Sequence, residues 1–358
     1  MRDIPSFEDQ PTRISFTDGE FVTISRGRFL PEDGLLGEGN VMVSKKKEKS
    51  DLIKPSRRVG GILETALIIQ DQDVLDANEL GILNRALVQC SLPHSDPGNQ
   101  LEVWSRNNGN TNLTIQPHRF VKDGEVRCAG YPFGVIPRLL LIYLATEAQK
   151  TQCHEIGLGN SLSSFMRSLG LDVNGDDIKR FKDQMWRLFS ASIKFTYDSE
   201  EVKAASNASV ADEVVLWWDE KRPTQNNLLD SYVVLNQQFL NDIISHPVPL
   251  DLRAVRALRQ SPLALDLYLW LTHRVSYLER SQRISWMSLS DQVGANYKNV
   301  RELTRYAKAE ICKIQALWPY LKIEYQRGGF VIHPTQPHVP QKTIVTFPLL
   351  PKKVANPQ

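Results

Sequence analysis

Residues 296–317 read NYKNVRELTRYAKAEICKIQAL. Along this stretch the apolar residues and the basic residues each recur with the period of an α-helix. Apolar residues recur at steps of three or four and form one stripe: Val300, Leu303, Ala307, Ile311 and Ile314. At about 100° per residue, the basic residues fall on the opposite side: Lys298, Arg301, Arg305 and Lys308. We therefore predict an amphipathic helix that packs with one face and presents a cationic face outward.

The elements predicted on either side of this helix follow a recognisable order. An apolar helix at 260–278 begins with Ser261 as N-cap and Pro262 at the first helical position. An extended stretch at 282–285 and a short helix at 287–293 follow, and Gly294 ends that helix in a tight turn. After the basic helix, strands at 321–326 and 329–333 form a hairpin with Arg327 at its tip. This order, over residues 260–334 (the second block), is typical of a winged helix-turn-helix that reads double-stranded DNA.

Charge is unevenly distributed along the chain. The 358 residues carry a formal net charge of +2, whereas residues 251–333 hold 13 Lys and Arg against 7 Asp and Glu, a net of +6. Such a concentration of positive charge suits phosphate binding. The alternative is a solvated helix face without a ligand, which is the commoner explanation of a single basic helix. The order of the surrounding elements favours DNA.

The same order of elements is predicted once more, over residues 134–218 (the first block). A helix at 134–146 is followed by an extended piece at 154–157, a short helix at 161–169 closed by Gly170, a longer helix at 176–192, and strands at 193–197 and 214–218. We therefore predict an α+β fold with two tandem winged-helix domains. In the longer helix, Asp183 dilutes the charge of Lys179, Arg180 and Arg187, and Trp186 is expected in the core in preference to a stacking platform. This domain is expected to touch DNA, to pack against a partner copy as a homodimer, or to do both.

Five regions are predicted along the chain. Residues 1–58 form a mostly disordered arm, and 59–218 the first winged-helix domain, with an added helix at 76–90 and a hairpin from 101–106 and 112–116. Residues 219–260 are a linker, 261–334 the second winged-helix domain, and 335–358 a disordered tail. In the linker Arg253, Arg256 and Arg259 recur every three residues along one helical edge. They are candidates for binding phosphates or an acidic patch on the first domain.

Several function classes lack support in the sequence. No apolar run is long enough to span a membrane and the N-terminus lacks a signal peptide, so we expect a cytoplasmic bacterial protein. The four cysteines are too far apart for the usual zinc or dithiol spacings, and no phosphate-binding loop or His-x-His pair occurs. We therefore expect no enzyme, cofactor or metal. A DNA-nicking enzyme and a transcriptional repressor or partition-type DNA-binding protein are the competing hypotheses.

Five short strings carry a family resemblance: Tyr131–Arg138 (YPFGVIPR), Ile156–Gly159, Ser161–Met166, Leu169-Gly170 and Arg327–Phe330. With them the chain resembles the RepA-type plasmid replication initiators over roughly residues 60–334. The resemblance implies a protein that binds repeated sequences, or iterons, in a plasmid origin and helps to open the adjacent AT-rich duplex. It also implies recruitment of the host initiator and the replicative helicase, and a switch between self-repressing dimers and initiating monomers.

The predicted DNA contacts lie mainly on the basic helix of the second block. In the major groove, the side chains nearest the bases are expected to be Lys298, Asn299, Arg301, Glu302 and Arg305. Lys308 and Arg327 are expected at phosphates or in the flanking minor groove. The basic residues of the linker and of the first block complete the set.

Overall fold

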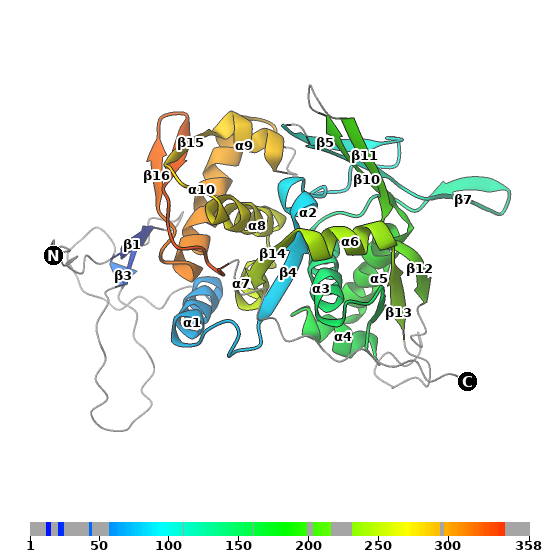
Figure 1. Ribbon diagram of the computed structural model, residues 1–358, viewed down its shortest axis with the longest axis horizontal. Helices are drawn as coiled ribbons and strands as arrows, with labels where there is room; N and C mark the ends of the chain where they lie inside the picture. Colours follow the sequence, from blue (N-terminus) through cyan, green and yellow to red (C-terminus); the bar gives the residue numbers. More distant parts are fainter. Residues whose placement is uncertain are drawn as a thin grey trace.

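A computed structural model describes residues 57–109, 111–159, 161–198, 203–215, 231–293 and 297–340, together with three short strands nearer the N-terminus (Figure 1). Those strands are β1 (Thr12–Ser15), β2 (Phe21–Ile24) and β3 (Val43–Ser44), which pair into an antiparallel sheet. The described chain combines helices with small sheets of two to four strands, which is the α+β class that the sequence predicts. The structure differs from the predicted arm, because 1–58 includes these strands and the start of helix α1 at Arg57.

The second block follows the predicted order. Its elements are α8 (Pro262–Ser276), β15 (Gln282–Ser285), α9 (Trp286–Gln292), α10 (Val300–Leu317), β16 (Ile323–Gln326) and β17 (Gly329–Ile332). The strands form one sheet in the order β15-β17-β16. Helix α10 begins four residues later than predicted because the Asn299 side chain caps it, accepting a hydrogen bond from the Glu302 amide at 2.9 Å. The predicted turn at Gly294 lies outside the described residues.

The first block has the same order, with one hairpin inserted. It runs through α3 (Val135–Thr151), β9 (Glu155–Gly157), α4 (Leu162–Ser168), α5 (Gly175–Ser190), β10 (Ser192–Asp198), β11 (Lys203–Ser209), β12 (Ala211–Val215) and β13 (Tyr232–Leu235). Strands β10 and β11 belong to a separate sheet, in the order β11-β10-β6-β5. The sheet β12-β13-β9 has the topology of β16-β17-β15. The first block therefore extends to Leu235, beyond the predicted boundary at 218.

The predicted linker is part of the folded body. After β13 it forms α6 (Gln237–Ser245), β14 (Pro247–Asp251) and α7 (Leu252–Leu258). Strand β14 pairs antiparallel with β4 (Leu80–Asn84), so that Val248 lies opposite Leu83. The helix predicted at 76–90 is thus replaced by β4 and a short helix α2 (Arg85–Gln89). Leu80 and Leu83 are buried as helical spacing suggests, but pairing with a distant strand outweighs the local preference.

The remaining elements precede the first block. Helix α1 (Arg57–Asp71) lies near α7 and α10, and β5 (Trp104–Asn108) pairs with β6 (Thr111–Gln116) in the predicted hairpin. Strands β7 (Arg119–Lys122) and β8 (Glu125–Cys128) form a hairpin of their own. The buried apolar side chains make one connected core that spans both blocks. Figure 1 shows α3, β4 and α8 near its centre.

The segment after β17 also differs from prediction. Residues 335–340 were expected in a disordered tail, but Val339 is buried and the His338 ring stacks on Trp318, with ring centroids 5.4 Å apart. The Trp318 indole donates a hydrogen bond to the Gln336 carbonyl at 3.1 Å. The tail expected at 341–358 lies outside the described residues.

Candidate nucleic-acid interface

The outer face of α10 and the residues just before it carry cations that no carboxylate of the described residues neutralises. Lys298, Arg301, Arg305 and Lys308 are all exposed, and none of them forms an ion pair within the described chain. The opposite face is buried, because Leu303, Ala307, Ile311 and Ile314 are 0% exposed. The packing face and the cationic face predicted from the sequence are therefore both present. An unneutralised cationic face is available to an anionic ligand.

Aromatic rings hold two of these cations in place. The Arg305 guanidinium lies 4.7 Å from the centroid of the Tyr306 ring and donates a hydrogen bond to the Tyr306 hydroxyl at 2.9 Å. The Tyr306 ring stacks on that of Tyr297, with centroids 5.6 Å apart. Such contacts limit side-chain freedom while the charge stays exposed. Sequence reasoning missed these tyrosines, although the adjacency of Arg305 and Tyr306 was a signal.

The Lys308 side chain extends from α10 towards the hairpin that follows this helix. Its ammonium is 5.0 Å from the centroid of the Tyr325 ring on β16 and 6.0 Å from that of Trp286 at the start of α9. The Trp286 ring also packs on Phe330 of β17, at 4.9 Å. Three elements thus fix the position of one cation, at the junction of helix and hairpin.

The hairpin tip adds further positive charge. Arg327 is exposed in the turn between β16 and β17, as predicted. Arg283, on β15, donates a hydrogen bond to the Arg327 carbonyl at 3.0 Å and is also exposed. Arg283 was missed because a lone arginine in a short strand has no sequence signal. The tip therefore presents two exposed guanidinium groups.

Two of the predicted base contacts also have local structural roles. The Asn299 oxygen accepts the cap hydrogen bond, which leaves its amide nitrogen as the donor for any ligand. Glu302 is half-buried in the first turn of α10, where a carboxylate interacts favourably with the helix dipole. Both residues lie on the N-terminal turn next to Arg301.

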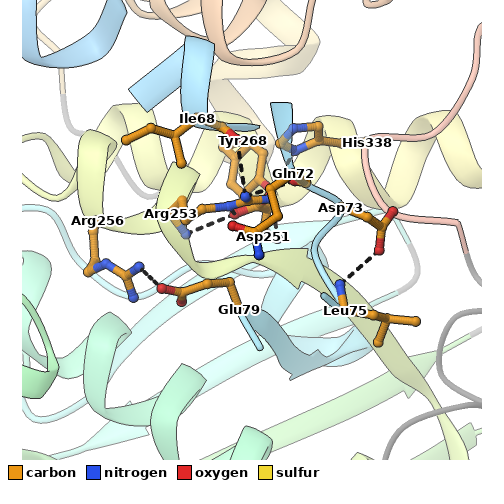
Figure 2. Close-up of polar contacts among 10 residues, drawn as sticks. All are labelled: Ile68, Gln72, Asp73, Leu75, Glu79, Asp251, Arg253, Arg256, Tyr268 and His338. Atoms are coloured by element: carbon orange, nitrogen blue, oxygen red, sulfur yellow. Dashed lines mark hydrogen bonds and ion pairs between the residues drawn. The ribbon is translucent and has the colours of Figure 1, made fainter. Parts of the chain in front are cut away.

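The three arginines of the predicted linker do not form one exposed edge. Figure 2 shows two of them, Arg253 and Arg256, each beside its own carboxylate partner. Arg253 is 6% exposed, forms an ion pair with Asp251 at 2.7 Å and donates to the Gln72 carbonyl at 2.9 Å. Because it is buried and paired, we remove it from the candidate phosphate contacts. Arg256 forms an ion pair with Glu79, a residue of the predicted first domain. This contact agrees with the alternative that the arginines bind acidic residues of that domain. Arg259 donates to the Arg256 carbonyl at 2.7 Å and is partly exposed.

The candidate DNA contacts of the first block also include both exposed and ion-paired residues. Lys179 and Arg180 are exposed on α5. The Arg187 side chain is only 18% exposed and forms ion pairs with Asp96 at 2.8 Å and Asp183 at 2.9 Å. Arg187 is therefore neutralised, and we also remove it from the candidate contacts. The assignment of Trp186 to the core is wrong, because its side chain is 51% exposed while Phe181, Met185 and Leu188 form the buried face of α5.

In the part of the chain that the structure describes, no group of three His, Cys, Asp or Glu side chains is arranged to hold a metal ion. None of the described helices combines the length and the apolar character needed to cross a membrane.

Comparisons with known proteins give one family match and two similar crystal structures. Residues 131–291 match the model of a family described as plasmid-encoded RepA protein. Two crystal structures of domains 2 and 3 of RctB resemble the fold, with TM-scores of 0.42 and 0.44 and sequence identities of 10% and 11%. The matches cover 69% and 70% of this chain, and 95% and 97% of those chains. No curated protein sequence matches the chain.

Proposed function

Because residues 131–291 belong to the family of plasmid-encoded RepA proteins, we propose that this chain initiates plasmid replication by binding repeated double-stranded sequences in the origin. The observation that carries the proposal is the α10 face, where Lys298, Arg301 and Arg305 are exposed without carboxylate partners. A plasmid origin supplies the phosphates and guanine edges that such a face would bind.

In this proposal both blocks are winged-helix domains. Each has the order helix, strand, helix, helix, strand, strand, and in each three-stranded sheet the last strand of that order lies in the middle. Helix α10 would lie in the major groove, where arginine and lysine pair with guanine, asparagine with adenine and glutamate with cytosine. Lys298, Asn299, Arg301, Glu302 and Arg305 would read bases.

Phosphate contacts would surround this helix. Lys308 of α10 lies against Tyr325 of the hairpin, and Arg327 and Arg283 are exposed at the hairpin tip. Arg259, Lys179 and Arg180 are exposed or partly exposed cations that remain for flanking contacts. Phosphate contacts position a protein on DNA and give no sequence information, so these residues would add affinity at every site alike.

After binding, the protein would open the adjacent AT-rich duplex and recruit the host initiator and the replicative helicase, in the bacterial cytoplasm. Binding energy, and no catalysis by this chain, would drive these steps. A first block that is rigidly joined to the second would give each bound copy a defined orientation along tandem repeats. A second copy of the chain is the further partner that the family resemblance implies.

The decisive experiment is selection of bound sequences from random duplex DNA, with affinity for the best site measured at two salt concentrations. We expect one motif, recurring in tandem beside the gene, and a larger affinity for it than for scrambled duplex at both salt concentrations. Equal affinity for all sequences that collapses with salt would overturn the proposal.

Origin opening needs a separate test, because a repressor would also bind a specific sequence. Permanganate footprinting of a supercoiled plasmid that carries the selected repeats detects unpaired thymines. We expect reactive thymines in the AT-rich segment next to the bound repeats. An intact duplex at saturating protein would favour a transcriptional repressor or partition-type protein instead.

A further inference from the structure

Helix α1 has one face that the rest of the described chain leaves exposed. Glu64, Leu67, Ile68 and Asp71 recur at steps of three and four residues, so their side chains are neighbours on this outer face of α1. All four residues are exposed, Leu67 at 63% and Ile68 at 49%. The opposite face of the helix contributes to the connected core. An exposed apolar pair between two carboxylates is a surface that a segment of matching chemistry can cover.

A cleft opens beside Ile68. It has a volume of about 970 Å³ and lies between α1, α7, α8 and α10, with Gly61 and Thr65 also among its α1 residues. Most of the basic side chains that line the cleft have carboxylate partners, among them Arg253 and Lys313. The cleft therefore has room for the side chains of a covering segment, and few of its cations are left for an anionic ligand.

Acidic charge surrounds the outer face of α1. Residues 59–84 contain five Asp and Glu and no Lys or Arg. One of the five, Glu79, pairs with Arg256. The other four are exposed and form no ion pair within the described chain: Glu64, Asp71, Asp73 and Asp76. Because opposite charges steer and orient a bound segment, the segment that covers this face should be basic as well as apolar.

The last described residues of the chain lie close to the end of α1. Arg253 donates a hydrogen bond to the Gln72 carbonyl at 2.9 Å and forms the ion pair with Asp251. The Asp251 amide donates to the Tyr268 hydroxyl at 3.1 Å, and this hydroxyl lies 2.8 Å from His338 Nδ1. Figure 2 shows this short series of contacts from α1 to His338. The chain beyond residue 340 therefore starts beside α1.

The sequence beyond Pro340 has the chemistry that the outer face of α1 requires. Residues 341–358 contain the apolar run 344–350 (IVTFPLL), three lysines on its two sides and no acidic residue. The four residues from Pro340 to Ile344 can span up to about 14 Å. The other end of the chain is a poorer match, because residues 1–56 hold 9 Lys and Arg against 10 Asp and Glu.

We propose that the apolar run at 344–350 docks on the outer face of α1 of the same chain, over Leu67 and Ile68 and into the cleft beside them. The lysines on either side of the run then lie among the acidic residues that surround this face. Apolar burial supplies the affinity, and the charges orient the segment. Since α1 lies near α7 and α10, the docked tail holds this helix onto the second block. The contact goes beyond the proposed function and does not depend on it.

Binding of the tail as a separate peptide tests the docking. A chain that ends at Pro340 keeps all the described helices and strands, and it should bind a fluorescent peptide of residues 341–358 saturably. The full chain should bind the peptide at least about tenfold more weakly, because its own tail competes at a high effective concentration. Fluorescence anisotropy measures both affinities. Absence of binding to the shortened chain, or equal affinity of the two chains, would overturn the proposal.

Variants of the full chain test the surface. Trypsin cleavage after Lys342, followed by mass spectrometry, reports how often the tail is released. Leu67→Asp should make this cleavage about tenfold faster, because it places a carboxylate under the apolar run. Asp71→Lys should also speed it by reversing a charge of the same face. Lysine in the last turn of α1 is favourable for the helix, so unfolding does not explain this effect.

Val121→Asp is the matched control. Val121 is an apolar residue of β7 that is 71% exposed and lies outside α1, so the variant should leave the cleavage rate within about twofold of wild type. A tail that is cleaved equally fast in the wild-type chain and in all three variants would overturn the docking site.

Discussion

Arg138 and Asp266 form a buried bidentate ion pair that joins the two blocks. The guanidinium Nε lies 2.7 Å from Asp266 Oδ1 and Nη2 lies 2.8 Å from Oδ2, and both side chains are 4% exposed. Arg138 comes from α3 and Asp266 from α8, which hold the same place in the order of their blocks. His94 completes the cluster, with its Nε2 2.6 Å from Asp266 Oδ2. Burial alone would raise the pKa of Asp266, but Arg138 and His94 hold it below its usual range.

Replacing Arg138 with methionine should unfold the protein more easily. The change leaves the Asp266 carboxylate buried without its charge partner, and we expect a loss of about 3–5 kcal/mol in the free energy of unfolding. Urea denaturation measures it. The control is Lys150→Met, which breaks the partly exposed Lys150–Glu147 pair and should cost less than about 1 kcal/mol. A loss in Arg138→Met no larger than the control would contradict the assigned role.

Stability should fall as the pH drops from about 6.5 towards 4. Burial, helped by the positive charge of Arg253, lowers the pKa of His338 to about 4, although Asp251 opposes the shift. The unfolded chain therefore binds a proton below its own pKa near 6.5 that the folded chain does not bind, and protonation favours unfolding. The His338→Gln variant should reduce the slope of unfolding free energy against pH in this range by up to about 1.4 kcal/mol per pH unit. Burial and two neighbouring arginines also lower the pKa of His273 to about 4, so part of the slope should remain in the His338→Gln variant. An identical slope in His338→Gln would contradict the prediction.

Arg301 and Lys308 should differ in their effects on DNA binding. Arg301→Ala removes a base contact in the proposed complex, so we expect a loss of about 1–3 kcal/mol on the selected site and relaxed preference at one base pair. Lys308→Ala removes a phosphate contact and should weaken selected and scrambled duplexes alike. Fluorescence anisotropy with both duplexes measures the two losses. If both variants lose the same affinity on both duplexes, Arg301 does not contact bases.

Arg253 and Arg327 should separate folding from DNA binding. Arg327→Ala removes an exposed cation, so the slope of log affinity against log salt concentration should fall by about 1. Arg253→Met should leave that slope unchanged, because Arg253 is buried against Asp251, and should lower the free energy of unfolding instead. If a folded Arg253→Met variant shows a smaller slope of log affinity against log salt concentration, Arg253 does contact phosphates.

The sequence by itself determined the elements of the second block and the two faces of its basic helix. Leu303, Ala307 and Ile311 are buried where their spacing of four residues places them, and Arg301 and Arg305 are exposed. The N-cap at Ser261 is also present, where the side chain accepts a hydrogen bond from the Ala264 amide at 3.2 Å. These features could be predicted because a helix brings together residues only three or four positions apart.

Only the tertiary structure decided which charges are available and how the blocks are joined. Arg253 and Arg301 are both basic residues on amphipathic helices, yet Arg253 is buried and paired with Asp251 while Arg301 is exposed. Strand β4 pairs with β14 across more than 150 residues, which no local pattern could reveal. The same holds for Arg138 and Asp266, 128 positions apart. A charge is neutralised or left free by the residues that folding brings near it, and those residues lie far away in the sequence.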